Sequence, residues 1–214
     1  RRRRFLIEIV RATRAAIGPG KILAVKLNSA DFQRGGFTEE ESTAAIRALD
    51  AESVDLLEIS GGTYSSAAMV GVGKQSKSSQ KASTRSREAY FMAFAERVRK
   101  EVAMPLMITG GLRSAAAMSE ALAAGIEVVG VARPMTLEPD LAARLIADPS
   151  TVSQLHPVRT GLSFADGAAE IIWHNRQMRR IARGLDPDPQ IDGKLGLLRI
   201  FLRGRVLPRR RRLP

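Results

Sequence analysis

Two short segments in the second half of the chain carry residues that could bind an anion. Gly110 and Gly111 follow one apolar run, and Arg133 follows the next apolar run along the chain. Glycine lets backbone N–H groups approach an anion closely, and a guanidinium adds a charge-assisted contact. Ser114 can cap the helix that comes next, whose N-terminus would then point toward the same anion. The pattern predicts a phosphate site, although a glycine pair alone also fits a tight turn that binds nothing.

Lys26 is the second position whose residue type suggests chemistry. It lies late in a run of Ile, Leu, Ala and Val at residues 22–27, where an unpaired charge is costly to bury. Such a lysine either faces a ligand or forms a structural ion pair with Asp31 or Glu58. The residue types leave both interpretations open.

The remaining candidates favour structural roles. We expect surface or packing positions for His156 and His174, because both fall outside the predicted strand ends. Trp173 is expected to anchor a C-terminal helix, and Tyr64 would either line a pocket or lie exposed in a loop. The chain has no cysteine and only two histidines, so a disulfide, a thiolate metal site and a cysteine nucleophile are excluded, and we expect no metal.

The spacing of apolar residues predicts four strands that alternate with helices. The strands are expected at residues 22–27, 54–59, 105–109 and 127–131. The helices are expected near residues 5–17, 38–52, 85–102, 114–124 and 139–146. Nearly continuous apolar strands of this kind are typical of a parallel sheet covered by helices. The chain is therefore predicted to be an α/β protein, as a small open sheet or as half of an eight-stranded barrel, with the candidate residues at the carboxyl ends of the strands.

The segments outside these units differ in composition. Residues 60–84 are rich in Gly, Ser and Lys and predict a long loop, and a further helix is expected at about residues 165–183. Residues 186–214 are rich in Pro and Arg and predict a poorly packed tail. We therefore expect one domain at residues 1–185 and a tail at residues 186–214.

The formal net charge of +12 is concentrated at the two ends of the chain. Four arginines at residues 1–4 and six at residues 203–212 account for most of it, so the body is nearly neutral. Such runs can hold phosphate backbones loosely, which makes a nucleic-acid-binding protein a rival function, but we expect them to be solvated ends. No apolar run approaches the roughly 20 residues of a membrane helix, so a cytoplasmic protein without a membrane partner is expected.

Six segments together resemble the NADH:flavin oxidoreductase (old yellow enzyme) family. They occur in the family's order within a resemblance that covers about residues 2–185. The segments are KLNSADF (26–32), GGFTEEE (35–41), LEISGGTY (57–64), REAYF (87–91), TGGLR (109–113) and VGVARP (129–134).

The resemblance implies an eight-stranded βα barrel that holds FMN at its C-terminal mouth. Lys26 stands where the family places a basic residue against the flavin pyrimidine edge. Gly110, Gly111, Ala132 and Arg133 stand where it binds the FMN phosphate, with Ala132 at a position that is often glycine. The implied reaction moves a hydride from NAD(P)H to FMN and then to the β-carbon of an activated alkene, such as an enone.

The same resemblance begins in the family's fourth helix, so this chain would supply only the C-terminal half of the barrel. The groups that polarise and protonate the substrate belong to the other half, and no catalytic residue is assigned here. Because the chain starts at Arg1 rather than Met, we expect the missing half to lie upstream. A half barrel would expose two sheet edges and an apolar interior, which predicts self-association. A catalytically incomplete FMN- or phosphate-binding module and another phosphate-binding barrel, such as an aldolase or isomerase, remain rival functions.

Overall fold

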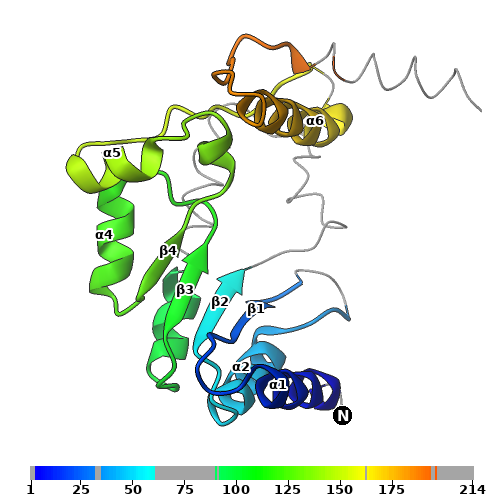
Figure 1. Ribbon diagram of the computed structural model, residues 1–214, viewed down its shortest axis with the longest axis vertical. Coiled ribbons are helices and arrows are strands. Elements are labelled where there is room, and N and C mark those ends of the chain that lie inside the picture. The colour runs from blue at the N-terminus through cyan, green and yellow to red at the C-terminus, as the bar shows by residue number, and fades with distance from the viewer. Residues whose placement is uncertain are drawn as a thin grey trace, which may run out of the picture.

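A computed structural model of the chain describes residues 3–31, 35–60, 90, 92–161, 163–193 and 196. Its sheet has four parallel strands in the order β1-β2-β3-β4, which are Ala24–Asn28, Leu56–Ser60, Leu106–Thr109 and Val128–Gly130. The helices are α1 (Arg4–Ile17), α2 (Glu39–Asp50), α4 (Ala115–Ala123), the 3₁₀ helix η1 (Arg133–Thr136), α5 (Leu141–Ala147) and α6 (Ser163–Ile181). Residues 92–99 are also helical. Figure 1 shows the four strands side by side, with α4 next to β4 and α6 beyond the strand ends.

One face of the sheet builds the hydrophobic core. Successive side chains of a strand point to opposite faces, so every second residue of β2 and β3 meets the helices. These residues are at most 1% exposed: Leu57, Ile59, Leu106 and Ile108. They form one cluster with side chains from three α-helices and the helical segment 92–99, among them Val10, Ile46, Leu49, Phe94, Val98 and Ala121. The parallel α/β class predicted from apolar periodicity is confirmed.

The opposite face of the sheet carries a row of register partners, one from each strand: Lys26, Glu58, Met107 and Val128. None of the four belongs to the helix-packed core. The Lys26 side chain is 57% exposed, and Val128 is 39% exposed. The expectation of an apolar inner face is therefore wrong for this row, because a pair of opposite charges fills half of it.

The two outer strands of the described sheet are β1 and β4, each of which pairs with a single neighbour. Over the described residues the sheet is thus open. The four βα units are present as predicted, and their closure into a barrel stays a prediction.

Local sequence signals set the helix ends close to the predicted positions. The Thr38 hydroxyl accepts a hydrogen bond from the Glu41 N–H, and the Glu41 carboxylate accepts one from the Thr38 N–H, so the capping box at the start of α2 is complete. α1 ends at Gly18, whose φ of 75° suits glycine. α6 begins and ends about two residues earlier than predicted.

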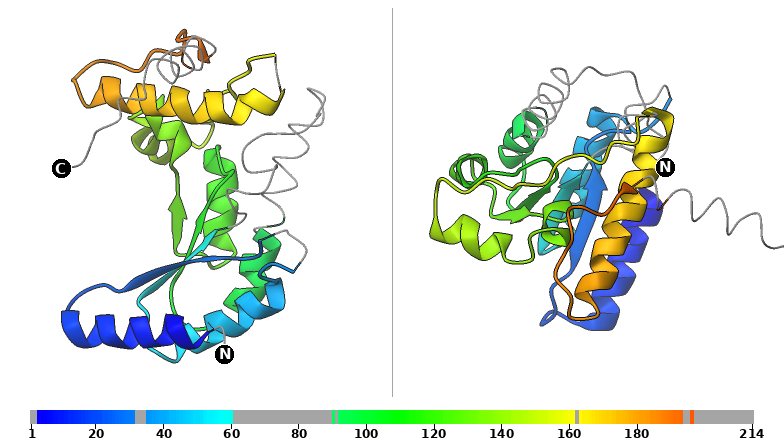
Figure 2. Two further views of the ribbon diagram at one scale, coloured as in Figure 1. Left: turned by 90° about the vertical axis from the view of Figure 1, so that its right-hand side faces the viewer. Right: turned by 90° about the horizontal axis from the view of Figure 1, so that it is seen from above.

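α6 lies beyond the carboxyl ends of the strands and packs against η1 (Figures 1 and 2). Trp173 is 5% exposed and donates its indole N–H to the Ile191 carbonyl at 3.0 Å. Gln177 is fully buried and makes hydrogen bonds with both backbone groups of Asp188, at 2.7 and 2.8 Å. Trp173 therefore anchors α6 as predicted. The residues just past position 185, where we expect the tail to begin, are bonded to this helix.

Candidate functional site

The carboxyl ends of β3 and β4 lie side by side, because Thr109 and Gly130 are register partners. Immediately after β3, Gly110 and Gly111 have φ values of 126° and 81°, in the region that favours glycine. A Cβ added at Gly110 would meet no atom within 4 Å, so the space beside this turn is open. Both glycines therefore have backbone conformations that favour glycine, and among the described residues no atom would contact a side chain added at Gly110.

Several backbone N–H groups at these two strand ends have no acceptor among the described residues. They belong to Gly110, Gly111 and Ala132. Neighbouring N–H groups without protein partners are the kind of donors that an anion uses when they point to one place. We refer to these three N–H groups together with the Arg133 guanidinium as the anion cup.

Arg133 is the first residue of η1 and is bonded to α6. Its Nη1 donates to Glu170 Oε1 at 2.8 Å, and the side chains of Arg133 and Glu170 are 51% and 20% exposed. Burial raises the pKa of the Glu170 carboxyl, but His174 and Arg133 beside it outweigh that effect and hold the pKa below its ordinary value. Glu170 is therefore an ionised partner of Arg133 at neutral pH.

Two of the first three backbone N–H groups of α4 already have acceptors within the protein. The Ala115 N–H donates to the Thr151 carbonyl at 3.0 Å, and the Ala117 N–H donates to the Ser114 hydroxyl at 3.2 Å. Ser114 caps the helix as predicted. The segment 151–153 takes up the first donor of this N-terminus, and whether the remaining Ala116 N–H faces an anion stays a prediction.

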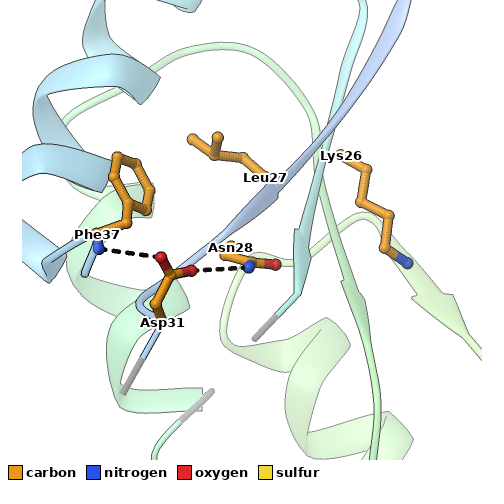
Figure 3. A pocket seen from close by; sticks show the side chains of 5 residues that line it. All are labelled: Lys26, Leu27, Asn28, Asp31 and Phe37. Carbon is orange, nitrogen blue, oxygen red and sulfur yellow. Dashed lines mark hydrogen bonds between the residues drawn. The ribbon is translucent and has the colours of Figure 1, made fainter. Parts of the chain in front are cut away.

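Lys26 forms an ion pair within the sheet. Its Nζ lies 2.5 Å from Glu58 Oε1, and the two residues are register partners on β1 and β2. Of the interpretations that the sequence left open, the structure shows the pair with Glu58. Asp31 instead accepts hydrogen bonds from the Asn28 side chain at 3.2 Å and from the Phe37 N–H at 3.0 Å (Figure 3).

An open depression of about 370 Å³ lies at the carboxyl end of β1, lined by Lys26, Leu27, Asn28, Asp31 and Phe37. Figure 3 shows the Lys26 amino group pointing away from Asp31 and Phe37. Because β1 and β4 are opposite edges of the sheet, Lys26 lies at the other edge from the strand that Ala132 and Arg133 follow, while Gly110 and Gly111 follow the strand next to it.

Glu170, the ion-pair partner of Arg133, is the residue of this candidate site that sequence reasoning missed. The signal that could have found it is the spacing of Glu170 and His174, four residues apart on one predicted helix, which places a carboxylate and an imidazole on the same face. His174 is 8% exposed and packs edge-on against Trp173, with ring centroids 5.1 Å apart. This is the packing role predicted for it.

The other predicted positions add no chemistry to the cup. His156 is exposed, as expected, and Tyr64 lies outside the described residues. Across the part of the chain that the structure describes, no group of three or more His, Asp and Glu side chains is placed to hold a metal ion. No helix in that part is both long and apolar enough to span a bilayer.

The family model described as NADH:flavin oxidoreductase / NADH oxidase matches residues 1–149, which include all four strands and η1. The chain belongs to this family. The resemblance seen in the short segments is thus confirmed, and with it the flavin and the NADH that the family's description names. α6 lies beyond the matched residues.

Proteins of the same description are similar to the chain over much of its length. The NADH-dependent flavin oxidoreductase iliE of a Neonectria species is 33% identical over 155 residues, covering 71% of this chain and 20% of that protein. The NADH-dependent flavin oxidoreductase nadA of Aspergillus parasiticus is 31% identical over 188 residues, covering 87% and 40%. An NADH oxidase of Thermoanaerobacter brockii is 26% identical over 141 residues, covering 65% and 20%. The chain thus spans about a fifth to two fifths of the length of these relatives.

Among solved structures, the carboxyl transferase domain of Rhizobium etli pyruvate carboxylase with pyruvate matches 95% of this chain and 34% of that chain. Its sequence identity is 14% and its TM-score is 0.43, a similarity too low to define the fold.

Proposed function

We propose that the chain is part of an FMN-dependent oxidoreductase of the ene-reductase type. The reaction takes a hydride from NADH or NADPH and delivers it to the β-carbon of an activated alkene such as an enone. The observation that carries the proposal is the anion cup, which lies where two parallel strands end in a chain of the flavin oxidoreductase family. The names of the relatives, which are NADH-dependent, support NADH as the reductant.

The anion cup fits the phosphate of FMN. A phosphate monoester carries up to two negative charges and needs several donors, and the cup offers three N–H groups and one guanidinium. Alanine at position 132 removes no donor compared with glycine, because the contact uses the backbone. Gly110 keeps side-chain atoms away from the turn, so an anion can come within hydrogen-bond distance of the amides.

Lys26 is the second positively charged residue that we assign to cofactor binding. FMN, when bound, supplies a ring that accepts a hydride and passes it on, and the reduced ring carries negative charge at its pyrimidine edge. An ammonium beside that edge stabilises the charge, which is the role proposed for Lys26. Glu58 fixes the ammonium on the inner face of the sheet, so the lysine is held in place without a ligand.

The architecture proposed for the whole protein is an eight-stranded barrel, of which residues 1–185 are the C-terminal half. The unpaired edges of β1 and β4 would bind the remaining strands, and the inner row that contains Lys26 and Glu58 would line the interior. Where those strands are missing, the same edges favour pairing with a second copy of the chain. The groups that polarise and protonate the substrate are assigned to the other half. We place the enzyme in the cytoplasm.

The first experiment is an absorbance spectrum of the purified chain before and after incubation with FMN and desalting. A retained flavin band is expected, and Arg133→Ala should weaken FMN binding about tenfold by removing a charge-assisted contact to the phosphate. Arg47→Ala is the matched control, because Arg47 makes a comparable half-exposed ion pair with Glu101 far from the cup. Equal FMN affinity in the Arg133→Ala and Arg47→Ala variants would contradict the assignment of the cup.

A second candidate function is a catalytically incomplete FMN-binding module. The observation that favours it is the share of the relatives' length that the chain covers, at most about two fifths in these comparisons. FMN that is retained after desalting but not reduced by NADH or NADPH would support the module. Turnover of an enone by the flavin-loaded chain would exclude it.

A further inference from the structure

The proposed phosphate ligand Arg133 is bonded to a helix that lies outside the part of the chain matched by the family model. The match ends at residue 149, and α6 begins at Ser163. Glu170 on this helix accepts the hydrogen bond from Arg133 Nη1 at 2.8 Å. The anion cup is therefore connected to the C-terminal helix α6 by this hydrogen bond, although only the cup lies within the residues that the family model matches.

Glu170 also lies close to a second side chain of its own helix, that of His174. His174 lies one turn further along α6, and its Nε2 is 3.7 Å from the same carboxylate oxygen that accepts from Arg133. This Nε2 is buried and has no hydrogen-bond partner among the described residues. The same carboxylate oxygen thus lies close to both the Arg133 guanidinium and a buried imidazole.

Thr136 completes a second connection between the same two elements. Its hydroxyl donates to the Arg133 carbonyl at 2.9 Å and lies 2.6 Å from His174 Nδ1. A hydroxyl has one hydrogen, so when Thr136 donates to Arg133 the proton between Thr136 and His174 belongs to Nδ1. The imidazole then donates to Thr136, so η1 is bonded to α6 through Thr136 as well as through the Arg133 side chain.

We propose that Glu170 is a positioning residue that orients the Arg133 guanidinium toward the phosphate of FMN before the cofactor arrives; this rests on the function proposed above. The bond to Glu170 engages Nη1, one of three nitrogens in a planar group with five N–H donors, so donors for a phosphate remain. An arginine that is half exposed would otherwise lose side-chain freedom when it binds. Because the bond to Glu170 already restricts the Arg133 side chain, less of its freedom is lost when FMN binds.

The test compares the dissociation constants of FMN and riboflavin, which lacks the phosphate. In the wild-type chain FMN should bind more tightly, and Arg133→Ala should abolish this preference. Glu170→Ala should reduce the FMN preference about 3- to 10-fold with an unchanged riboflavin constant. Glu170→Gln keeps an oxygen that accepts from Arg133 and should retain most of the preference. Glu101→Ala, which removes the partner of Arg47 elsewhere, is the matched control.

Three results would overturn the inference: an FMN preference in Glu170→Ala equal to wild type, a stronger preference, or equal losses for FMN and riboflavin. A different result would overturn the proposed function instead: the wild-type chain binds FMN no more tightly than riboflavin, and Arg133→Ala changes neither dissociation constant. NMR of the Arg133 Nη–H groups in the flavin-free protein separates the two questions. A discrete signal is expected in wild type and should be lost in Glu170→Ala, whereas a freely exchanging group in wild type would exclude positioning whether or not flavin binds.

Discussion

Lys26 and Glu58 are register partners on neighbouring parallel strands, and their charged atoms lie 2.5 Å apart on the face of the sheet that no described core helix covers. A lysine within an apolar strand is therefore compensated inside the sheet itself. The pair places the ammonium on the face of the sheet where the proposed role needs it, beside negative charge that develops on the reduced flavin.

Lys26→Ala should separate flavin chemistry from stability. Its side chain is 57% exposed, so loss of the ion pair should change the free energy of unfolding by less than about 1 kcal/mol. In the flavin-loaded protein, reduction by NADH should slow about 10- to 100-fold, because charge on the reduced ring loses its counterion. Stopped-flow bleaching of the flavin measures this rate. Lys21→Ala changes an exposed lysine off the sheet and is the control; equal rates in the two variants would refute the role of Lys26.

Gly130→Ala should destabilise the sheet next to the anion cup. A Cβ at this position would lie 2.1 Å from Thr109 Oγ1 and 2.6 Å from Met107 Cε, so one of them must move, at about 1–3 kcal/mol. Thr109 Oγ1 is buried and has no hydrogen-bond partner among the described residues, so Thr109→Ala gives up no bond there and should restore most of the loss.

Gly20→Ala is the matched control for this double-mutant cycle, because a Cβ there meets nothing within 4 Å and its φ is not in the left-handed region. It should change the free energy of unfolding by less than about 0.5 kcal/mol. Urea denaturation of Gly130→Ala, Thr109→Ala, the double variant and the Gly20→Ala control measures the coupling free energy between positions 109 and 130. Additive effects of Gly130→Ala and Thr109→Ala would contradict the contact.

Leu57→Ala should cost about 3 kcal/mol of unfolding free energy, because this residue is fully buried at the centre of the helix-packed face. Ile146→Ala removes a similar volume from a side chain that is 88% exposed and should cost less than about 0.5 kcal/mol. The urea concentrations at the midpoints of unfolding give both changes in unfolding free energy, when the variants and wild type share the same dependence of that free energy on urea. A cost below about 1 kcal/mol at Leu57 would mean that the four strands do not share one core.

Much of the fold could be predicted because its signals are local. Largely apolar runs of five or six residues located all four strands, and Thr38 with Glu41 fixed the start of α2. The shared position of Gly110, Gly111, Ala132 and Arg133 after two neighbouring parallel strands could also be predicted, since the carboxyl ends of parallel strands lie at one edge of the sheet. Their role as an anion cup stays a prediction.

The remaining site features depend on packing between distant segments. Glu170 pairs with Arg133 across 37 positions only because α6 lies on η1, and no local pattern predicts that approach. The contact of residues 151–153 with the α4 N-terminus has the same origin, since this segment lacks a periodic apolar pattern and its course is set by bonds to other elements. Lys26 shows the intermediate case, in which the residue type predicted a partner but the register was needed to choose Glu58 over Asp31.

Glu170 should make the attachment of α6 sensitive to acid. Its pKa in the folded chain is held below the ordinary value of 4.5, so the ionised form contributes stability that is fully present above that value and is lost as the pH falls through the lower folded pKa. Glu170→Gln lacks this contribution. At neutral pH the variant should be less stable than wild type by about 1 kcal/mol, since the pair is only partly buried.

The difference between Glu170→Gln and wild type should shrink once the pH falls below about 4.5 and vanish in stronger acid. The chain's single tryptophan, Trp173, is buried on α6 and reports this contact directly by fluorescence during urea unfolding. Glu120→Gln, which changes an exposed carboxylate of α4, is the control. A stability difference for Glu170→Gln that stays constant from neutral pH into acid would show that the carboxylate charge does not hold α6 against Arg133.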